Sequence, residues 1–251
     1  MSENFLQSKI YRLCVIIQFM KTICLSENAN SILKQYLRTK GYRLIEIRKT
    51  DAVYDAVASH GDIYLCKICG ELVVSPEQLP LIEEGLLHSN AKFTLGASGL
   101  GHKYPDNVSY NAAQMGNYLI HNKNHTNPVI LQKSEEFEME LIHVKQGYTK
   151  CNLVILDDKA VITSDPGLAA VLRKHDLEIL LISPGHVALT GFPYGFLGGA
   201  SGRVDDEIIF NGNLSTHPDF EIINDFIRQR GLQATYFDEY PLEDIGSIIQ
   251  L

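Results

Sequence analysis

The chain has 251 residues, of which 45% are hydrophobic and 21% are charged, and its formal net charge at pH 7 is −8. This composition is typical of a folded globular protein. The acidic balance, with no basic run longer than "RK", argues against a broad nucleic-acid surface, which needs clustered Lys and Arg. We expect a single domain over residues 1–251.

The first apolar run, "LCVIIQFM", lies near the start of the chain. It is shorter than the ~20 residues that span a bilayer. No small-residue cleavage site follows it, so it is also a poor signal peptide. We expect a buried strand at residues 14–19, a helix over residues 26–41 capped by Ser26 and ended at Gly41, and a strand at residues 42–47.

Four later segments share one pattern: a strand-like run, a polar residue, a proline and then a helical pattern. The prolines are Pro76, Pro128, Pro166 and Pro218, with an average spacing of about 47 residues, which is typical of a repeat architecture. Proline is favoured in the first helical turn. The preceding Ser75, with Gln78 in capping-box spacing, and Asp165 are expected to cap their helices.

Each of these helices is followed by a further apolar run: "AKFTL", "MELIHV", "LEILLI" and "LQATYF". Each first strand also has a hairpin partner, most clearly in "NLVILDDKAVITS" with Asp157 and Asp158 at the turn. The repeat is therefore strand, strand, helix, strand. A fifth copy is split between residues ~10–47 and ~242–251, and such a split predicts a closed ring. An open doubly wound sheet is the alternative.

Several segments resemble an uncharacterised bacterial family assigned to the guanidino-group-modifying enzyme fold, or pentein fold. The most specific are "HVKQGYTKC" and "YGFLGGASG", and the resemblance covers most of residues 42–251. It implies an α/β propeller of five pseudo-symmetric ββαβ units around a central cavity. The wider superfamily includes arginine deiminases, dimethylarginine hydrolases and amidinotransferases, together with non-catalytic ribosome anti-association factors.

The resemblance implies a cysteine nucleophile in the last repeat and an acidic-Gly-Gly-Asp substrate motif, and this chain has neither. Residues 244–251 contain no cysteine, and "GGASG" carries no carboxylate. Standard guanidine hydrolysis therefore cannot be transferred. We expect a protein that binds a small polar or cationic, guanidine-like ligand in the central cavity. The alternative is an atypical hydrolase or amidinotransferase using Cys151.

Two residues are candidates for catalysis in that alternative. Cys151, the last cysteine, follows Lys150 at the start of a hairpin strand, where lysine neighbours would lower the thiol pKa. A buried packing role is the other interpretation. His186, in "SPGHVAL", follows a strand and could project from a loop toward the cavity as a base.

The candidate ligand-binding residues stand where hairpins begin, because these positions converge at one end of a closed ring. They are Asp106, Asn111, Lys145, Tyr148, Lys150, Gly199, Ser201 and Asp244. Ordinary turn chemistry is the alternative for the Asp and Asn residues. The glycines of "GGASG" are explained by close backbone approach at the ring centre.

No metal or cofactor site is expected. Cys66 and Cys69 form a CxxC motif with no second pair, which we interpret as structural. The five cysteines are an odd number, which argues against a disulfide scaffold and favours a reducing, cytoplasmic location. No nucleic-acid or membrane partner is expected.

Overall fold

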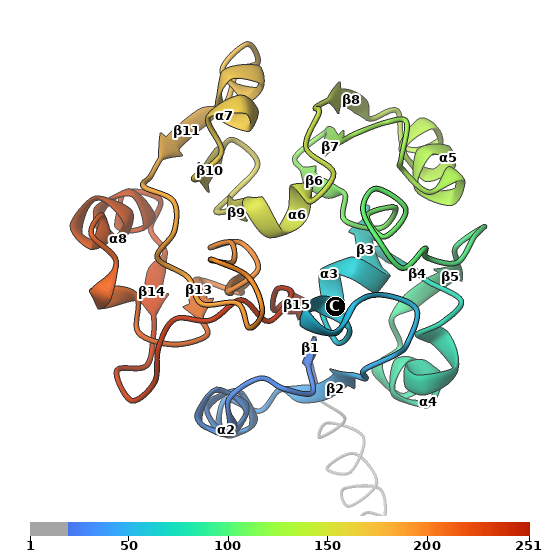
Figure 1. The fold of residues 1–251 in the computed structure, drawn as a ribbon, viewed down its shortest axis with the longest axis horizontal. Coiled ribbons are helices and arrows are strands. Elements are labelled where there is room, and N and C mark those ends of the chain that lie inside the picture. Colours follow the sequence, from blue (N-terminus) through green and yellow to red (C-terminus); the bar gives the residue numbers. More distant parts are fainter. Residues whose placement is uncertain (1–19) are drawn as a thin grey trace, which may run out of the picture.

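Five separate three-stranded sheets form the β-structure of residues 20–251, the part of the chain that the computed structural model describes. They are arranged around a common centre, and each belongs to one strand, strand, helix, strand unit (Figure 1). The pentein-type five-unit propeller is thus confirmed, and the open doubly wound sheet is excluded.

In every unit the first two strands pair antiparallel and the third strand pairs parallel to the second. The antiparallel pairs of units 1 to 4 are β3 (Leu65–Ile68) with β4 (Glu71–Val74), β6 (Ala113–Met115) with β7 (Tyr118–His121), β9 (Val154–Ile155) with β10 (Ala160–Thr163), and β12 (Ser201–Val204) with β13 (Glu207–Phe210). Their helices are α4 (Leu79–Ser89), α5 (Pro128–Glu136), α7 (Pro166–Leu172) and α8 (Phe220–Arg228). Their third strands are β5 (Lys92–Leu95), β8 (Glu140–His143), β11 (Glu178–Leu181) and β14 (Gln233–Thr235).

Unit 5 is built from both ends of the chain. Its first strand, β15 (Ile249–Gln250), pairs with β1 (Thr22–Ser26), which is followed by α2 (Ser31–Thr39) and β2 (Arg43–Ile47). The strand expected at residues 14–19 lies outside the described residues. The remaining short elements are the 3-10 turns η1 (Asp55–Val57) and η2 (Leu214–Thr216) and the single-turn helices α3 (Gly61–Tyr64) and α6 (Thr149–Asn152). Among residues 20–251, no helix combines the length and the apolar character needed to cross a bilayer.

The helix caps follow the sequence pattern only in part. Pro128 and Pro166 occupy the first turns of α5 and α7, and Asp165 accepts hydrogen bonds from the N–H groups of Gly167 and Leu168. The other two expected caps are wrong. Asn30, not Ser26, caps α2, and α4 begins at Leu79 because Ser75 starts a turn instead, so the Ser75 hydroxyl bonds no helix N–H.

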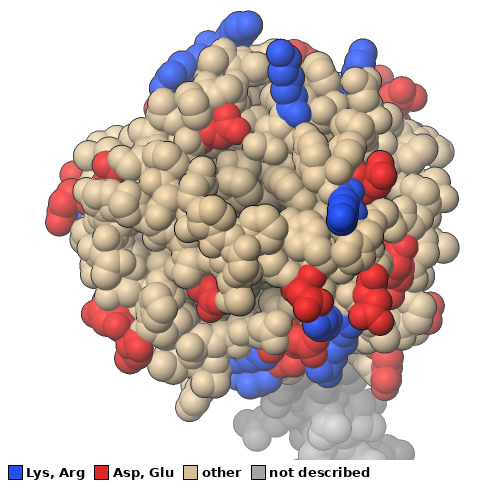
Figure 2. Space-filling model, viewed as in Figure 1, with Lys and Arg blue, Asp and Glu red and all other residues tan. Residues whose placement is uncertain are grey.

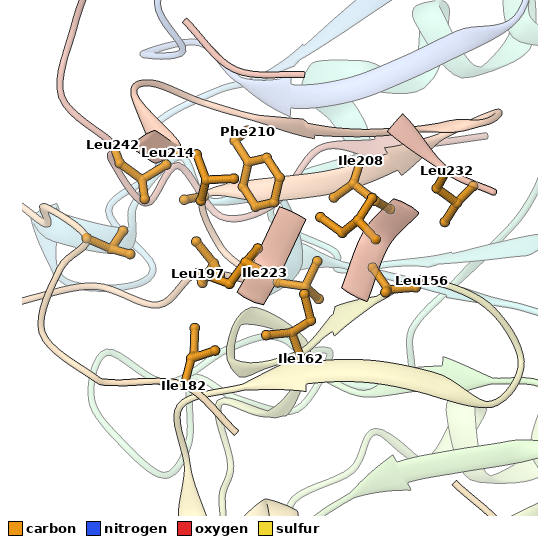
Figure 3. Packing of buried hydrophobic residues seen from close by; sticks show 14 of the residues in the cluster. Leu156, Ile162, Ile182, Leu197, Ile208, Phe210, Leu214, Ile223, Leu232 and Leu242 are labelled. Atoms are coloured by element: carbon orange, nitrogen blue, oxygen red, sulfur yellow. The ribbon is translucent and has the colours of Figure 1, made fainter. Parts of the chain in front are cut away.

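The apolar cores lie between units rather than within them. Each of the five clusters of buried hydrophobic residues combines side chains of two neighbouring units. Figure 3 shows the cluster between units 3 and 4, where Ile162 of β10 and Ile223 of α8 point toward one another beneath Phe210. Because each core needs two units, closing the ring buries the fifth core and contributes its hydrophobic free energy.

The centre of the ring is closed by polar contacts. Each unit donates one hydrogen bond to the unit before it, from a residue just ahead of its first strand. The five bonds run from Asp62 N to Gly246 O (2.9 Å), Asn111 Nδ2 to Asp62 O (3.0 Å), Lys150 N to Asn111 O (3.0 Å), Gly199 N to Cys151 O (2.8 Å) and Ser247 N to Gly199 O (2.7 Å). The chain therefore brings one short polar segment from every unit to a single point.

Candidate functional site

A cavity of about 600 Å³ opens at the end of the ring where these segments converge; we call it the acidic cavity. Its lining includes three carboxylates and neither Lys nor Arg. The lining residues are Ser26, Asn28, Tyr54, Asp55, Ala56, Ser59, His60, Leu189, Thr190, Gly191, Phe192, Glu243, Asp244 and Ile245. In the face shown in Figure 2, charged side chains lie mainly around the periphery.

Asp244 is the buried carboxylate of this cavity, with 5% of its surface exposed. Its two oxygens accept hydrogen bonds from Phe196 N (2.9 Å) and Gly246 N (3.0 Å). Burial raises the pKa of Asp244 to about 6, so the group is mostly ionised at neutral pH. The neighbouring residue Glu243 also has a raised pKa because of burial.

The nearest histidine does not neutralise Asp244. His60 Nδ1 lies 3.6 Å from Asp244 Oδ1, but burial lowers the pKa of His60 to about 4, so the imidazole is neutral at pH 7. Among the residues lining the acidic cavity, Asp244 therefore has no cationic partner. Behind the cavity, the charge of the buried Lys150 partly offsets the rise that burial causes in the pKa of Asp244. A cation entering from the cavity would add a partner on the open side of the carboxylate.

Aromatic side chains form one wall of the cavity. The rings of Tyr54 and Phe192 lie with centroids 5.4 Å apart, and Phe192 is 47% exposed. Tyr54 Oη is 3.0 Å from Tyr148 Oη, which in turn exchanges a hydrogen bond with the Asn107 side chain. This contact fixes the position of the Tyr54 ring, whose face can interact with a cation.

Behind Asp244, residues of units 1, 2, 3 and 5 form a polar group that we call the central cluster. It comprises His60, Asp62, Asn111, Lys150, Cys151, Asp244 and Ser247. Ser247 Oγ donates to Asp62 Oδ2 (2.6 Å) and accepts from Lys150 Nζ (3.2 Å). Burial, and then the charge of Asp244, raises the pKa of Asp62, whose other oxygen has no hydrogen-bond partner among residues 20–251.

Cys151 lies in the single-turn helix α6 and not at the start of a strand. Its Sγ is 3.5 Å from Asn111 Oδ1 and 3.6 Å from Tyr148 O. Burial, followed by the negative charges of Asp62 and Asp244, raises the pKa of the Cys151 thiol well above its ordinary value. Lys150 acts in the opposite direction, as expected from the sequence, but burial outweighs it.

The other candidate residues lie either at the ring centre and in a second cavity, or away from both. Gly199 lies at the centre, where it leaves no room for a Cβ beside the Asp244 carboxylate. Ser201 lines a second cavity. The remaining candidates lie elsewhere. His186 is exposed and packs on His217, with ring centroids 5.1 Å apart; Asp106 is exposed in a loop; and Lys145 lines a separate groove.

Sequence reasoning missed His60, Asp62, Glu243 and Ser247. A sequence signal was present for Asp62 and Ser247, because Gly61-Asp62 precedes the first strand of unit 1 as Gly246-Ser247 precedes that of unit 5. The aromatic wall had no such signal. Phe192 lies in the segment before unit 4 and Tyr54 in the segment before unit 1, so only ring closure brings them together.

Comparison with protein families assigns the chain to one family. Residues 24–249 match a family described as "Family of unknown function (DUF6873)". The chain belongs to this family. No curated protein sequence matches the DUF6873 chain.

Solved structures resemble the DUF6873 chain in fold. They include a cysteine-to-serine mutant of DDAH from Pseudomonas aeruginosa complexed with citrulline (TM-score 0.52, 10% identity, covering 87% of this chain and 92% of that one). An amidinotransferase of saxitoxin biosynthesis from Microseira wollei has a TM-score of 0.55 at 12% identity, covering 87% and 88%. The C. jejuni agmatine deiminase has a TM-score of 0.51 at 11% identity, covering 96% and 85%. These similarities confirm the pentein fold.

Proposed function

We propose that the acidic cavity binds a small organic cation with a guanidine-like head group, without the standard catalysis of guanidino-modifying enzymes. The observation that carries this proposal is the buried Asp244 carboxylate, which faces a cavity without Lys or Arg while its histidine neighbour stays neutral. A carboxylate pairs with a planar guanidinium through two parallel hydrogen bonds.

Two further observations support a cation of this kind. The Tyr54 and Phe192 rings supply faces for a cation–π contact. The structural neighbours include a DDAH bound to citrulline and an agmatine deiminase, so guanidino-related ligands occur in proteins of this fold.

A matched pair of ligands tests the proposal. Butylguanidine and butylurea have similar shapes, but only the first is charged at neutral pH. We expect butylguanidine to raise the melting temperature in a concentration-dependent way, because it binds the native state, and butylurea to have little effect. The cavity does not select a cation if the two compounds shift the melting temperature equally. The same holds if neither compound shifts it at a ligand concentration about a hundred times a Kd in the millimolar range.

The affinity for butylguanidine should depend on pH through Asp244. A bound cation stabilises the ionised carboxylate and lowers its pKa, so ligand and proton compete. Because the pKa of Asp244 is about 6 in the free protein, we expect constant affinity above about pH 7 and up to a tenfold loss per pH unit below about pH 6. Calorimetric titrations from pH 8 to pH 5 measure this. A constant affinity over that range would contradict a role for Asp244.

The alternative function uses Cys151 as the nucleophile of a guanidine- or amidine-modifying hydrolase or amidinotransferase. It requires an accessible thiolate, whereas Cys151 is buried and the pKa of its thiol is raised. We therefore expect iodoacetamide to leave Cys151 unmodified in the native protein at pH 7.5, as read by peptide mass spectrometry. Unfolded protein provides the positive control, and the half-buried Cys69 provides an internal comparison. Fast native alkylation of Cys151 would favour the alternative.

A further inference from the structure

A second cavity, of about 410 Å³, lies at the other end of the inner strands, away from the acidic cavity. It is lined by the first strand of every unit: β3, β6, β9, β12 and β15. We call it the strand cavity. None of the residues lining it also lines the acidic cavity.

Side chains that alternate along the inner strands face this cavity in two layers, since every second residue of a strand lies on the same face. The deeper layer is buried and mostly apolar: Leu65, Ala112, Leu153, Ser201 and Ile248. The next layer is accessible to solvent: Lys67, Gln114, Ile155, Arg203 and Gln250. The intervening residues, such as Cys66 and Val204, are buried in the cores between units. Lys150 of the central cluster also lines the strand cavity, so the two polar regions meet at this residue.

The cations of the accessible layer have no carboxylate partners. Neither Lys67 nor Arg203 lies within salt-bridge distance of an Asp or Glu in residues 20–251. Lys67 Nζ donates to the Gln250 backbone oxygen (2.6 Å), and the Arg203 guanidinium donates to the Leu156 and Asp205 backbone oxygens. Their positive charges are therefore held at the cavity wall but are not neutralised.

Three carboxylates stand at the rim of the same cavity, and two of them have cationic partners of their own. Asp205 pairs with Lys21 (2.5 Å), and Asp157 accepts turn N–H groups and lies 3.8 Å from Arg230. Asp158 is exposed at the turn. The lining thus holds three cations, Lys67, Lys150 and Arg203, and three carboxylates, and Arg230 also pairs with Glu178. Lys67 and Arg203 keep their positive charges without a carboxylate partner of their own.

A buried hydroxyl gives an independent indication of a ligand. Ser201 is 1% exposed and lines the strand cavity, and its Oγ has no hydrogen-bond partner among the described residues. A buried hydroxyl without a partner costs roughly 1–3 kcal/mol. An oxygen-bearing ligand in the cavity would supply the acceptor.

We propose that the strand cavity is a second binding site, which takes a small oxyanion held by Lys67 and Arg203 and hydrogen-bonded by Ser201. Its ligand is opposite in charge to the cation of the acidic cavity, so the two sites can be tested separately. Charge-assisted hydrogen bonds from Lys and Arg to phosphate or carboxylate oxygens are strong enough for this role.

Isothermal titration with inorganic phosphate and with acetate, at constant ionic strength, tests the site and distinguishes the two classes of oxyanion. We expect one of them to bind, and both Lys67→Gln and Arg203→Gln to weaken its binding about tenfold, the loss of one charge-assisted hydrogen bond. Lys174→Gln is the matched control, since Lys174 is exposed and lines neither cavity. If neither anion binds, or if both cavity variants bind as the control does, the proposal is wrong.

Ser201→Ala separates a ligand contact from a structural role. Because the hydroxyl has no partner in the free protein, its removal should leave the melting temperature unchanged or raise it, while anion affinity falls severalfold. A lower melting temperature with unchanged affinity would show that Ser201 is structural and would remove it from the site. Anion binding should also persist in Asp244→Asn, whatever becomes of cation binding.

Discussion

Asp244→Asn should weaken the binding of butylguanidine by about tenfold to a hundredfold, the effect of losing one or two charge-assisted hydrogen bonds. The substitution keeps the size of the side chain and removes its charge. It also leaves an acceptor for one of the two backbone donors, Phe196 N and Gly246 N, that now bond the carboxylate. Isothermal titration at pH 7.5, where Asp244 is mostly ionised, measures the loss.

The control for this variant is Asp176→Asn, because Asp176 is exposed, pairs with Lys159 and is not among the residues that line the acidic cavity. It should bind butylguanidine like the wild type. If Asp244→Asn folds poorly, Glu243→Gln gives a second measurement at the same cavity. Unchanged affinity in both cavity variants would contradict the proposed function.

Gly198→Ala should destabilise the fold by about 3 kcal/mol, the upper range for forcing an extra carbon into a packed interior. A Cβ on Gly198 would lie 2.5 Å from Cys151 O, 2.6 Å from Leu153 O and 2.7 Å from Leu153 N. All three are backbone atoms, so no side chain can rotate away. Since a chain of this size shifts by about 2–4 °C per kcal/mol, thermal unfolding should show a fall of about 6–12 °C.

Gly167→Ala provides the comparison. Gly167 lies in the first turn of α7, and its added Cβ would contact only the end of the Asp165 side chain, at 3.0 Å. We expect a change of less than about 1 kcal/mol, because alanine also favours the helix. Equal melting temperatures for the two variants would show that units 3 and 4 do not pack through this backbone contact.

The architecture could be predicted because it depends on local patterns that repeat. Each unit needs a hairpin, a helix start and an apolar strand, and residues such as Pro128, Pro166 and Asp165 stand at those places in the sequence. Helix boundaries were less certain. Ser26 and Ser75 have side chains that can cap a helix. Asn30, however, binds the N–H group at the start of α2, and at Ser75 the backbone oxygen accepts the N–H groups of a turn instead.

Members of the candidate site could be predicted only where a residue stood directly ahead of an inner strand. Asn111, Lys150, Cys151 and Asp244 were found in this way, and all four belong to the central cluster. His186 had suitable chemistry but belongs to a loop that packs against His217, away from Asp244. His60, whose position before α3 carries no pattern of its own, lies beside Asp244 instead.

The sequence by itself therefore determined the five-unit ring, the split fifth unit and the polar character of the centre, because repeated hydrophobic periodicity and turn residues act locally. Only the tertiary structure decided the ionisation of the site. Whether Cys151 is a thiolate, whether His60 is charged and whether Asp244 has a counter-charge depend on burial and on neighbours from other units. Those distances exist only once the ring has closed, and charge interactions in a poorly solvated interior are set by them.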